Sequence, residues 1–238
     1  MEKNNEQLSN NIQEKEHLSQ ILVHDLKSPL SNIQMLTFLF EELAVGKESE
    51  ELLIIFNKSL QDIFHLISQM ETLNEVDNTA LKPYLEEVDV NALIEEQISF
   101  FSRTAEVKNI QLQFFPSAED RKISSDINIL KRVISNLISN AIKFSDFNKA
   151  IKIHVVNTEN HIRVSICDEG PGIREDEQHR LFKRFSKLSN KPTNKESSSG
   201  LGLYIVKELL EKLNSTIELQ STFGEGSTFT INLPASSS

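Results

Sequence analysis

Cysteine is nearly absent from this 238-residue sequence: Cys167 is the single one, so no disulfide bond can form within the chain. That scarcity fits a reducing compartment. The sequence contains no run of about 18 apolar residues, so no segment is expected to span a membrane. The polar, acidic start lacks the basic end and apolar stretch of a signal peptide. Together these absences favour a cytoplasmic protein.

Positive charge is scarce in the first third of the chain. Residues 1–80 contain 5 Lys and 14 Asp or Glu, whereas the whole chain has a net charge of −10. A nucleic-acid-binding arm needs clustered positive charge, so a nucleic-acid partner is not expected. We interpret the acidic stretch as the solvated surface of helices.

Helix-breaking residues are also rare in this part, which has one glycine, Gly46, and one proline, Pro29. Apolar residues recur at helical spacing on both sides of Gly46, which predicts antiparallel helices over about 5–44 and 49–76. Two helices alone cannot cover both apolar stripes. A homodimer that forms a four-helix bundle would do so, and packing against the rest of the chain is the alternative. We therefore predict an all-α hairpin domain over 1–80.

The helical pattern stops at residues 77–87, which we interpret as a linker. The chain then alternates between helices and mostly hairpin-joined strands, which predicts an α+β two-layer sandwich over 85–238. Asp126 is expected to cap one of the helices. The expected helices cover 90–103, 126–144, 175–185 and 201–213, and the expected strands cover 110–115, 151–156, 162–168, 216–221 and 227–233.

His24 is the candidate nucleophile of the first helix. It lies two residues from both Leu22 and Leu26, so it points away from their apolar stripe. Asp25 follows directly, and Ser28 shares the face of His24 one turn later. Neutral imidazole is a nucleophile, and a neighbouring carboxylate can orient its ring. These residues alone leave open a surface histidine without a role.

Asn136, Asn140 and Lys143 are spaced by four and three residues, so they share one face of a predicted helix. Amide oxygens are suitable Mg²⁺ ligands, and a lysine can contact phosphate. The pattern therefore indicates a metal and phosphate site, with ordinary surface residues as the alternative.

Two glycine-containing segments are further candidates. Residues 168–172, Asp-Glu-Gly-Pro-Gly, end a predicted strand, and a carboxylate there can accept a hydrogen bond from an exocyclic amine such as that of adenine. Residues 200–203, Gly-Leu-Gly-Leu, enter an apolar helix whose first amides can bind phosphate. An ordinary turn and a simple helix start are the respective alternatives.

The segment His24-Asp25-Leu26-Lys27-Ser28-Pro29-Leu30 resembles the phosphoacceptor box of sensor histidine kinases. The resemblance implies that His24 accepts a phosphoryl group and that Asp25 assists in proton transfer. Ser28 occupies the position that orients the attacking water in family members with phosphatase activity, where Thr or Asn is usual.

The later motifs, over about 85–234, resemble the Bergerat-type ATPase domain shared by histidine kinases, type II topoisomerases, mismatch-repair ATPases and heat-shock chaperones. This resemblance implies a domain that binds ATP and Mg²⁺, with a mobile lid at about 174–199. It assigns Mg²⁺ to Asn140 and Asn136, phosphate to Lys143, the border of the base to Phe144, and the adenine amine to Asp168 with Gly170 and Gly172. The remaining implied nucleotide-binding residues are Phe182, Arg184, Phe185, Ser199, Gly200, Leu201, Gly202, Leu203 and Thr228.

The resemblance implies autophosphorylation of His24 with ATP, followed by phosphoryl transfer to an aspartate on the receiver domain of a separate response regulator. A membrane would be involved only through a sensor segment outside this sequence. The glycine box departs from the usual Gly-x-Gly-Leu-Gly-Leu because Ser198 replaces its first glycine. That departure supports the alternative of an ATP-binding scaffold, or a weakly active pseudokinase that binds a regulator. An ATP-driven conformational machine without phosphohistidine leaves the outward His24 unexplained.

Overall fold

The chain divides into two compact units, Met1–Thr72 and Leu73–Ser238. In the first unit every described residue is α-helical, as expected for two long helices. His24, Asp25, Ser28 and Gly46 lie outside the described residues, so the hairpin and its dimer stay predictions. The computed structural model describes residues 30, 31, 33, 35, 56, 59, 60, 63, 66–73, 81–119, 121–190, 192, 193 and 199–235.

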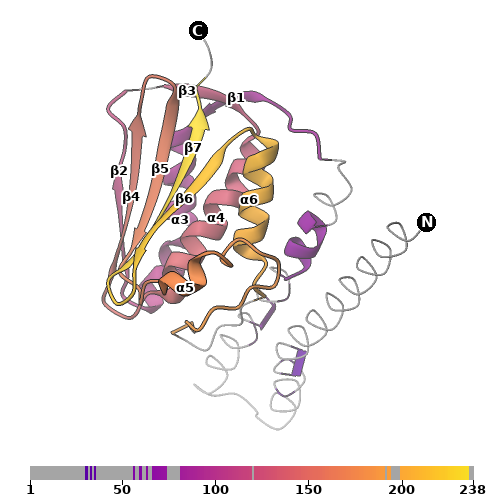
Figure 1. Ribbon diagram of the computed structural model, residues 1–238, viewed down its shortest axis with the longest axis vertical. Coiled ribbons are helices and arrows are strands. Elements are labelled where there is room, and N and C mark those ends of the chain that lie inside the picture. Colours follow the sequence, from indigo (N-terminus) through magenta and orange to yellow (C-terminus); the bar gives the residue numbers. More distant parts are fainter. Residues whose placement is uncertain are drawn as a thin grey trace, which may run out of the picture. The chain divides into compact units, whose positions relative to one another are not determined.

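The second unit is built on a five-stranded sheet with the strand order β2-β4-β5-β7-β6 (Figure 1). The β4–β5 and β6–β7 pairs are antiparallel hairpins, as expected, and β5 also pairs antiparallel with β7. In contrast, β2 and β4 run parallel. The strands are β2 (Gln111–Phe115), β4 (Ala150–Asn157), β5 (His161–Asp168), β6 (Thr216–Thr222) and β7 (Gly226–Pro234).

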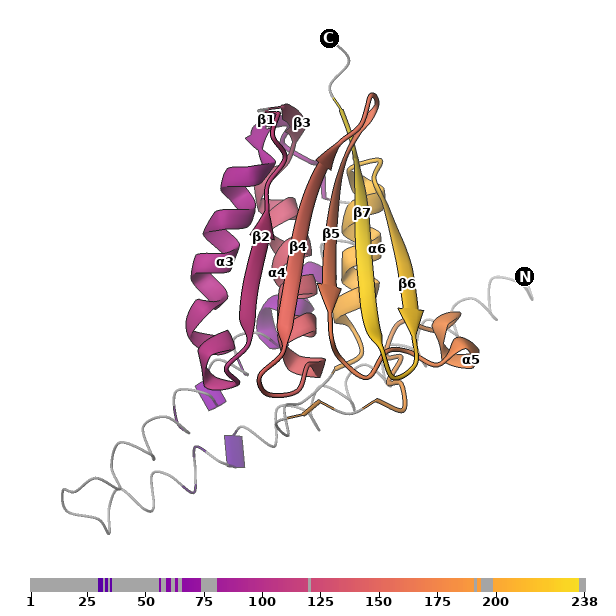
Figure 2. The same cartoon turned by 90° about the vertical axis from the view of Figure 1, so that its left-hand side faces the viewer.

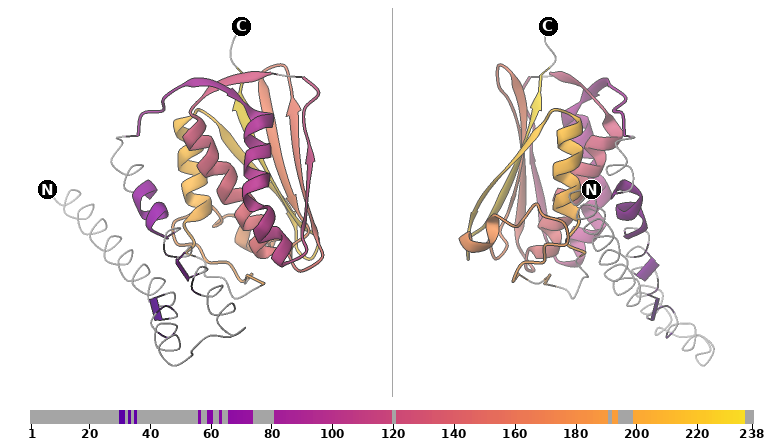
Figure 3. Two further views of the ribbon diagram at one scale, coloured as in Figure 1. Left: turned by 180° about the vertical axis from the view of Figure 1, so that it is seen from behind. Right: turned by 45° about the vertical axis from the view of Figure 1, so that its right-hand side comes forward.

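Three helices cover one face of this sheet (Figures 2 and 3): α3 (Val90–Val107), α4 (Ile127–Phe144) and α6 (Gly202–Lys212). The core lies between the two layers, where Ile134 and Ile138 of α4 and Ile153 of β4 are each 0% exposed. Strand residues alternate between the helix-covered face and the open face of the sheet. The predicted α+β two-layer sandwich is therefore confirmed for this unit.

The helix expected over 175–185 is much shorter than predicted. α5 (Glu175–Gln178) ends after about one turn, and the chain continues in turns such as the one closed by the Lys183 N–H and the Arg180 carbonyl, 3.0 Å apart. Phe185 then has a φ of +57°, a left-handed conformation that ends any helix. Phe182 and Phe185 both pack against the core, which draws this segment inward.

A second, two-stranded sheet was not expected from the sequence. It pairs β1 (Glu86–Asp89) with β3 (Lys122–Ser125), and Val88 lies opposite Ile123. Each of those two side chains is 1% exposed. The expected linker therefore ends earlier than predicted, because its last residues pair with a strand more than 30 residues away.

Asp126 caps α4 as predicted. Its Oδ1 accepts hydrogen bonds from the backbone N–H groups of Asn128 and Ile129, at 2.9 and 3.1 Å. Its Oδ2 accepts a third, at 2.8 Å, from the Tyr84 N–H. One side chain thus accepts hydrogen bonds from the first N–H groups of α4 and holds the irregular chain just before β1.

We expect Asp126→Ala to lower the free energy of unfolding by about 2 kcal/mol, near the upper end for N-caps, because three N–H groups lose their acceptor. Asp89→Ala is the matched control, since among the described residues the Asp89 cap of α3 accepts from the Ala92 N–H alone, at 3.0 Å. That variant should lose about 1 kcal/mol. Urea unfolding measures both, and equal losses would show that the contact with Tyr84 adds nothing.

Candidate nucleotide-binding site

The polar face of α4 carries Asn136 and Asn140, both half-buried. The Asn136 Nδ2 donates to the Arg132 carbonyl at 3.0 Å, which leaves its amide oxygen available. Within the described part of the chain, no hydrogen bond engages the Asn140 amide. Two amide oxygens one turn apart, with a half-buried setting and no competing donor, fit a hard cation such as Mg²⁺.

Lys143 and Phe144 form the last turn of α4, and both are half-buried. The Lys143 Nζ lies 5.9 Å from the centroid of the Phe144 ring. A cation at the end of a helix is favourably placed against the helix dipole. This turn therefore presents positive charge and an aromatic ring one turn beyond Asn140.

Asp168 ends β5 with its carboxyl group largely buried. Its Oδ1 accepts hydrogen bonds from the Gly170 N–H at 2.9 Å and the Ser227 N–H at 3.2 Å. Burial raises the pKa of Asp168 to about 6, although these two hydrogen bonds act in the opposite direction. No described residue donates to Oδ2. At neutral pH the site thus holds a buried carboxylate with one unused acceptor, which fits an exocyclic amine.

The glycines that follow Asp168 are required by close backbone contacts. A Cβ on Gly170 would lie 2.8 Å from the Asp168 Oδ1 and 3.2 Å from the Phe144 carbonyl oxygen. Gly172 has a φ of +62°, and a Cβ there would lie 2.0 Å from the Thr222 carbonyl oxygen. The turn is therefore pressed between the end of α4 and the β6–β7 hairpin, and it brings Asp168 and Phe144 together.

Gly200 brings the glycine box close to Phe185, one of the implied nucleotide-binding residues. It has a φ of +70°, and a Cβ there would lie 2.8 Å from the backbone carbon of Phe185. The Leu201 N–H donates to the Ser199 Oγ at 3.3 Å, and α6 then begins at Gly202 without a side-chain cap. The first amides of α6 are thus not occupied by a cap, as an anion site requires. Leu203 follows in this turn and is half-buried.

Arg184 is held against α6. Its Nη2 donates to the Tyr204 Oη at 2.7 Å, and its Cζ lies 4.6 Å from the centroid of the Tyr204 ring. Burial raises the pKa of Tyr204, so the phenol stays protonated at neutral pH and accepts this hydrogen bond. The segment around Arg184 and the start of α6 are therefore joined by side chains as well as by backbone.

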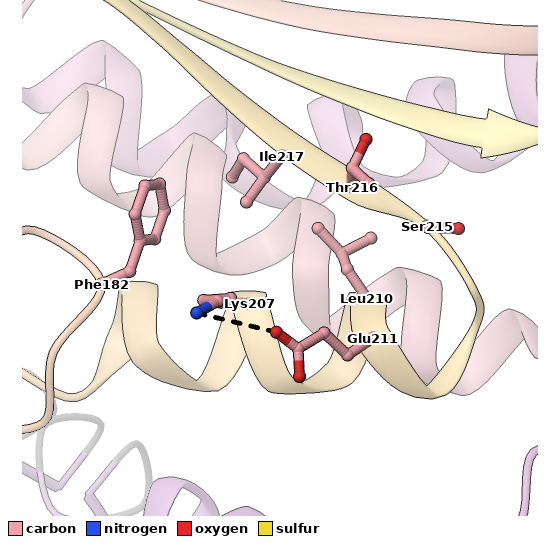
Figure 4. Close-up of a pocket in the computed structure, with 7 residues that line it drawn as sticks. All are labelled: Phe182, Lys207, Leu210, Glu211, Ser215, Thr216 and Ile217. Atoms are coloured by element: carbon pink, nitrogen blue, oxygen red, sulfur yellow. Dashed lines mark ion pairs between the residues drawn. The ribbon is translucent and has the colours of Figure 1, made fainter.

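The Phe182 side chain lies away from the other predicted nucleotide-binding residues. It lines a pocket between α6 and β6 together with Leu210 and Ile217, and the ion pair of Lys207 and Glu211 (3.7 Å) borders that pocket (Figure 4). None of the other predicted nucleotide residues lines it. The structure thus separates Phe182 from the cluster around Asp168.

Thr228 is likewise not brought to Asp168. In the register of β5 and β7, Ser227 lies opposite Asp168 and Thr228 lies opposite Cys167. Thr228 shares a strand face with Thr230, whose Oγ1 is 2.9 Å from the Ser165 Oγ on the open side of the sheet. Ser227, one position earlier, is the residue whose N–H contacts the carboxylate.

Sequence reasoning missed the contacts that hold the segment 174–199. The buried Glu177 accepts from the Ser189 N–H at 2.9 Å and from the Ser189 Oγ at 2.6 Å, and these bonds lower its pKa. The Asn190 Nδ2 donates to the Gly172 carbonyl. Polar residues in a loop give no periodic signal, so nothing in the sequence pointed to these anchors.

Comparison with known proteins identifies the family. A family model described as histidine kinase-, DNA gyrase B-, and HSP90-like ATPase matches residues 125–237. The histidine protein kinase SaeS of Staphylococcus aureus is 34% identical over 242 residues, which cover 95% of this chain and 66% of SaeS. The chain belongs to the sensor histidine kinases. That family consists of enzymes, the protein histidine kinases.

Another relative, the sensor protein EvgS of Escherichia coli, is 31% identical over 220 residues, which cover 89% of this chain and 18% of EvgS. The chain thus spans less than a fifth of that relative. The solved histidine kinase AdeS of Acinetobacter baumannii has a TM-score of 0.66 at 23% identity and covers 90% of this chain and 98% of that one. The histidine kinase ThkA, solved in complex with the response regulator protein TrrA, has a TM-score of 0.67 at 21% identity. The match covers 96% of this chain and 64% of the ThkA chain. Both likenesses concern the fold.

The helices in the described part of this histidine kinase are all too short or too polar to cross a bilayer.

The raised pKa of Asp168 predicts that removing its charge stabilises the protein. A folded-state pKa of about 6, above the ordinary 3.8, means that stability falls as pH rises through this interval. Asp168→Asn should therefore be more stable than wild type, by a margin that grows by about 1 kcal/mol between pH 5 and pH 7.5. Urea unfolding at both pH values measures this margin, and a margin that did not change with pH would contradict the assignment.

Proposed function

We propose that this chain binds ATP with Mg²⁺ in its second unit, phosphorylates its own His24, and passes the phosphoryl group to an aspartate of a response regulator. The observation that carries the proposal is the buried Asp168 carboxylate with its unused Oδ2, beside the end of the helix that presents Asn140. A carboxylate that opposes folding, in a family of ATP-dependent kinases, is best explained by a ligand that needs it.

The proposed nucleotide contacts follow from these atoms. The Asp168 Oδ2 accepts from the adenine amine, while Gly170 and Gly172 keep side chains away from the plane of the base. Asn140 and Asn136 would hold Mg²⁺, which would supply positive charge to offset that of the phosphates. Lys143 and the first amides of α6 contact the phosphates. Asn donors fit this role because a metal bound chiefly by phosphates needs few protein ligands.

The proposed transfer is an in-line displacement. An imidazole nitrogen of His24 attacks the γ-phosphorus, the bond from that phosphorus to the bridging oxygen breaks, and ADP leaves with its negative charge. Asp25, next in sequence, orients the ring and takes part in the transfer of its proton. Positioning and charge stabilisation supply most of the rate.

The proposed partners are a second copy of the chain and a receiver domain. The two expected apolar stripes of the first unit support a homodimer with a four-helix bundle. ThkA was solved with a response regulator protein, which supports the same class of partner here. Because the donor is ATP and the chain has one cysteine, we place these events in the cytoplasm.

Autophosphorylation predicts an acid-labile, base-stable label from ATP radiolabelled at the γ-phosphate. We expect wild type to incorporate it and His24→Gln to lose it completely, because the substitution removes the imidazole that accepts the phosphoryl group. His17→Gln is the matched control, a histidine of the same expected helix, and should label normally.

Label that persisted in His24→Gln would refute the assignment of the phosphoacceptor. A wild-type protein that bound ATP without acquiring label would favour the ATP-binding scaffold and direct attention to Ser198, which lies outside the described residues.

The contacts of Asp168 predict a change of nucleotide preference in Asp168→Asn. The Gly170 and Ser227 N–H groups require an oxygen at Oδ1, so the new NH₂ group must occupy the Oδ2 position. There it faces the adenine amine, donor against donor, and ATP affinity should fall by about 10-fold or more. Inosine triphosphate presents an oxygen instead and should lose much less.

Calorimetric titration with both nucleotides measures this preference. Glu169→Gln is the control, because the Glu169 side chain is exposed and, in the part of the chain that the structure describes, accepts from the Ala150 N–H alone, at 3.3 Å. An Asp168→Asn protein that weakened both nucleotides equally would exclude a contact with the base amine.

A further inference from the structure

Lys108 is a buried charge that the proposed reaction does not use. Its side chain is 2% exposed, and its Nζ donates to the Ile142 carbonyl at 2.8 Å, the Lys143 carbonyl at 3.2 Å and the Thr193 Oγ1 at 2.9 Å. Burying an ammonium group is costly unless it is fully hydrogen-bonded, and an apolar side chain would fill the same space at lower cost. The position of this charge therefore points to a specific use.

Lys108 contacts carbonyls of the last turn of α4, where a helix has no further N–H groups of its own to donate to them. They also carry the negative end of the helix dipole, so a cation is favourable there. Lys108 itself caps the end of α3, and Figure 2 shows that α3 and α4 end on the same side of the sandwich. The lysine thus fixes the end of one helix to the end of the next.

Thr193 is the third member of this cluster and comes from the segment 174–199. Its N–H donates to the Lys143 carbonyl at 3.2 Å, and its Oγ1 donates to the Ser145 carbonyl at 2.9 Å while it accepts from the Lys108 Nζ. The hydroxyl therefore bridges the buried ammonium group and the residue after α4. This bridge needs an oxygen with both a lone pair and a proton.

The cluster contacts the backbone at the end of α4, the helix that carries several of the proposed nucleotide contacts. It holds the Lys143 carbonyl directly, and the next residue, Phe144, presses its own carbonyl against the Gly170 turn that orients Asp168. Asn140 lies one turn earlier on the same helix. A shift of this helix end would move the proposed phosphate, base and Mg²⁺ contacts together.

We propose that Lys108 and Thr193 are positioning residues that join the segment 174–199 to the end of α4 and thereby set the geometry of the nucleotide site. We call the hydrogen-bonded contact of Lys108 and Thr193 with the end of α4 the junction. The inference rests on the proposed function for its effect on ATP, although the junction itself is present in the chain without nucleotide. Neither residue touches the nucleotide in this proposal.

The test compares Thr193→Val with Thr193→Ser in the full chain. Valine keeps the shape but loses the hydroxyl, whereas serine keeps the hydroxyl. We expect Thr193→Val to speed amide hydrogen exchange around Thr193 by about 10-fold in the nucleotide-free protein and to raise the Kd for Mg²⁺–ATP by about 5-fold. Thr193→Ser should stay within about 2-fold of wild type in both measurements, because its hydroxyl restores the bridge.

Thr230→Val is the matched control, because Thr230 is a buried threonine that bonds Ser165 on the open side of the sheet. It should leave exchange around Thr193 and the Kd unchanged, even where it lowers stability. Lys108→Met, with a side chain of similar length, should raise the Kd at least as much as Thr193→Val. Should Lys108→Met fail to fold, the pair of Thr193 variants still decides the matter.

Equal exchange and equal Kd values for Thr193→Val and Thr193→Ser would overturn the inference. Faster exchange in Thr193→Val without a change in Kd would also overturn it, because the junction would then not set the nucleotide site. A wild-type protein that bound no ATP would refute the proposed function instead, and the exchange measurement would still report on the junction.

Discussion

The burial of one face of α4 is the constraint on which the candidate site depends. Ile134, Leu137 and Ile138 are each at most 1% exposed, and they pack between the sheet and the neighbouring helices. A rotation of α4 that moved Asn136 or Asn140 would bring these apolar side chains into water, at a cost of about 1.5–3 kcal/mol each. The hydrophobic core thus orients the amides, although no amide belongs to the core.

The Asp168 carboxylate lowers the stability of the fold, in contrast to the buried face of α4, which raises it. Its pKa is raised to about 6 by burial, so ionisation at neutral pH opposes folding. Two backbone N–H groups offset part of that cost and fix one carboxyl oxygen, while the other keeps its full capacity to accept. Such an arrangement is typical of a site that is built for a ligand.

Polar contacts hold the segment between α5 and α6, in addition to the apolar packing of Phe182 and Phe185. Glu177 binds Ser189, Asn190 binds the Gly172 carbonyl, and Thr193 meets Lys108 at the end of α4. Hydrogen bonds of this kind each contribute about 0.5–1.5 kcal/mol, or more where a charge takes part.

The sequence by itself determined those features that depend on neighbours along the chain. Helical spacing and the Asp126 cap defined α4, alternation defined β4 and β5, and the glycines of the last turn defined the β6–β7 hairpin. The family followed from motifs of the same local kind, whereas the roles of Asn140, Asp168 and His24 stay predictions.

Tertiary structure alone decided the β1–β3 pairing, the parallel β2–β4 pair, the early end of α5 and the choice of Ser227 beside Asp168. It also brought Lys108 to Thr193, 85 positions away. These features depend on strand register and on contacts between distant segments. No local pattern encodes them, because the apolar spacing of each segment is the same whichever distant segment it contacts.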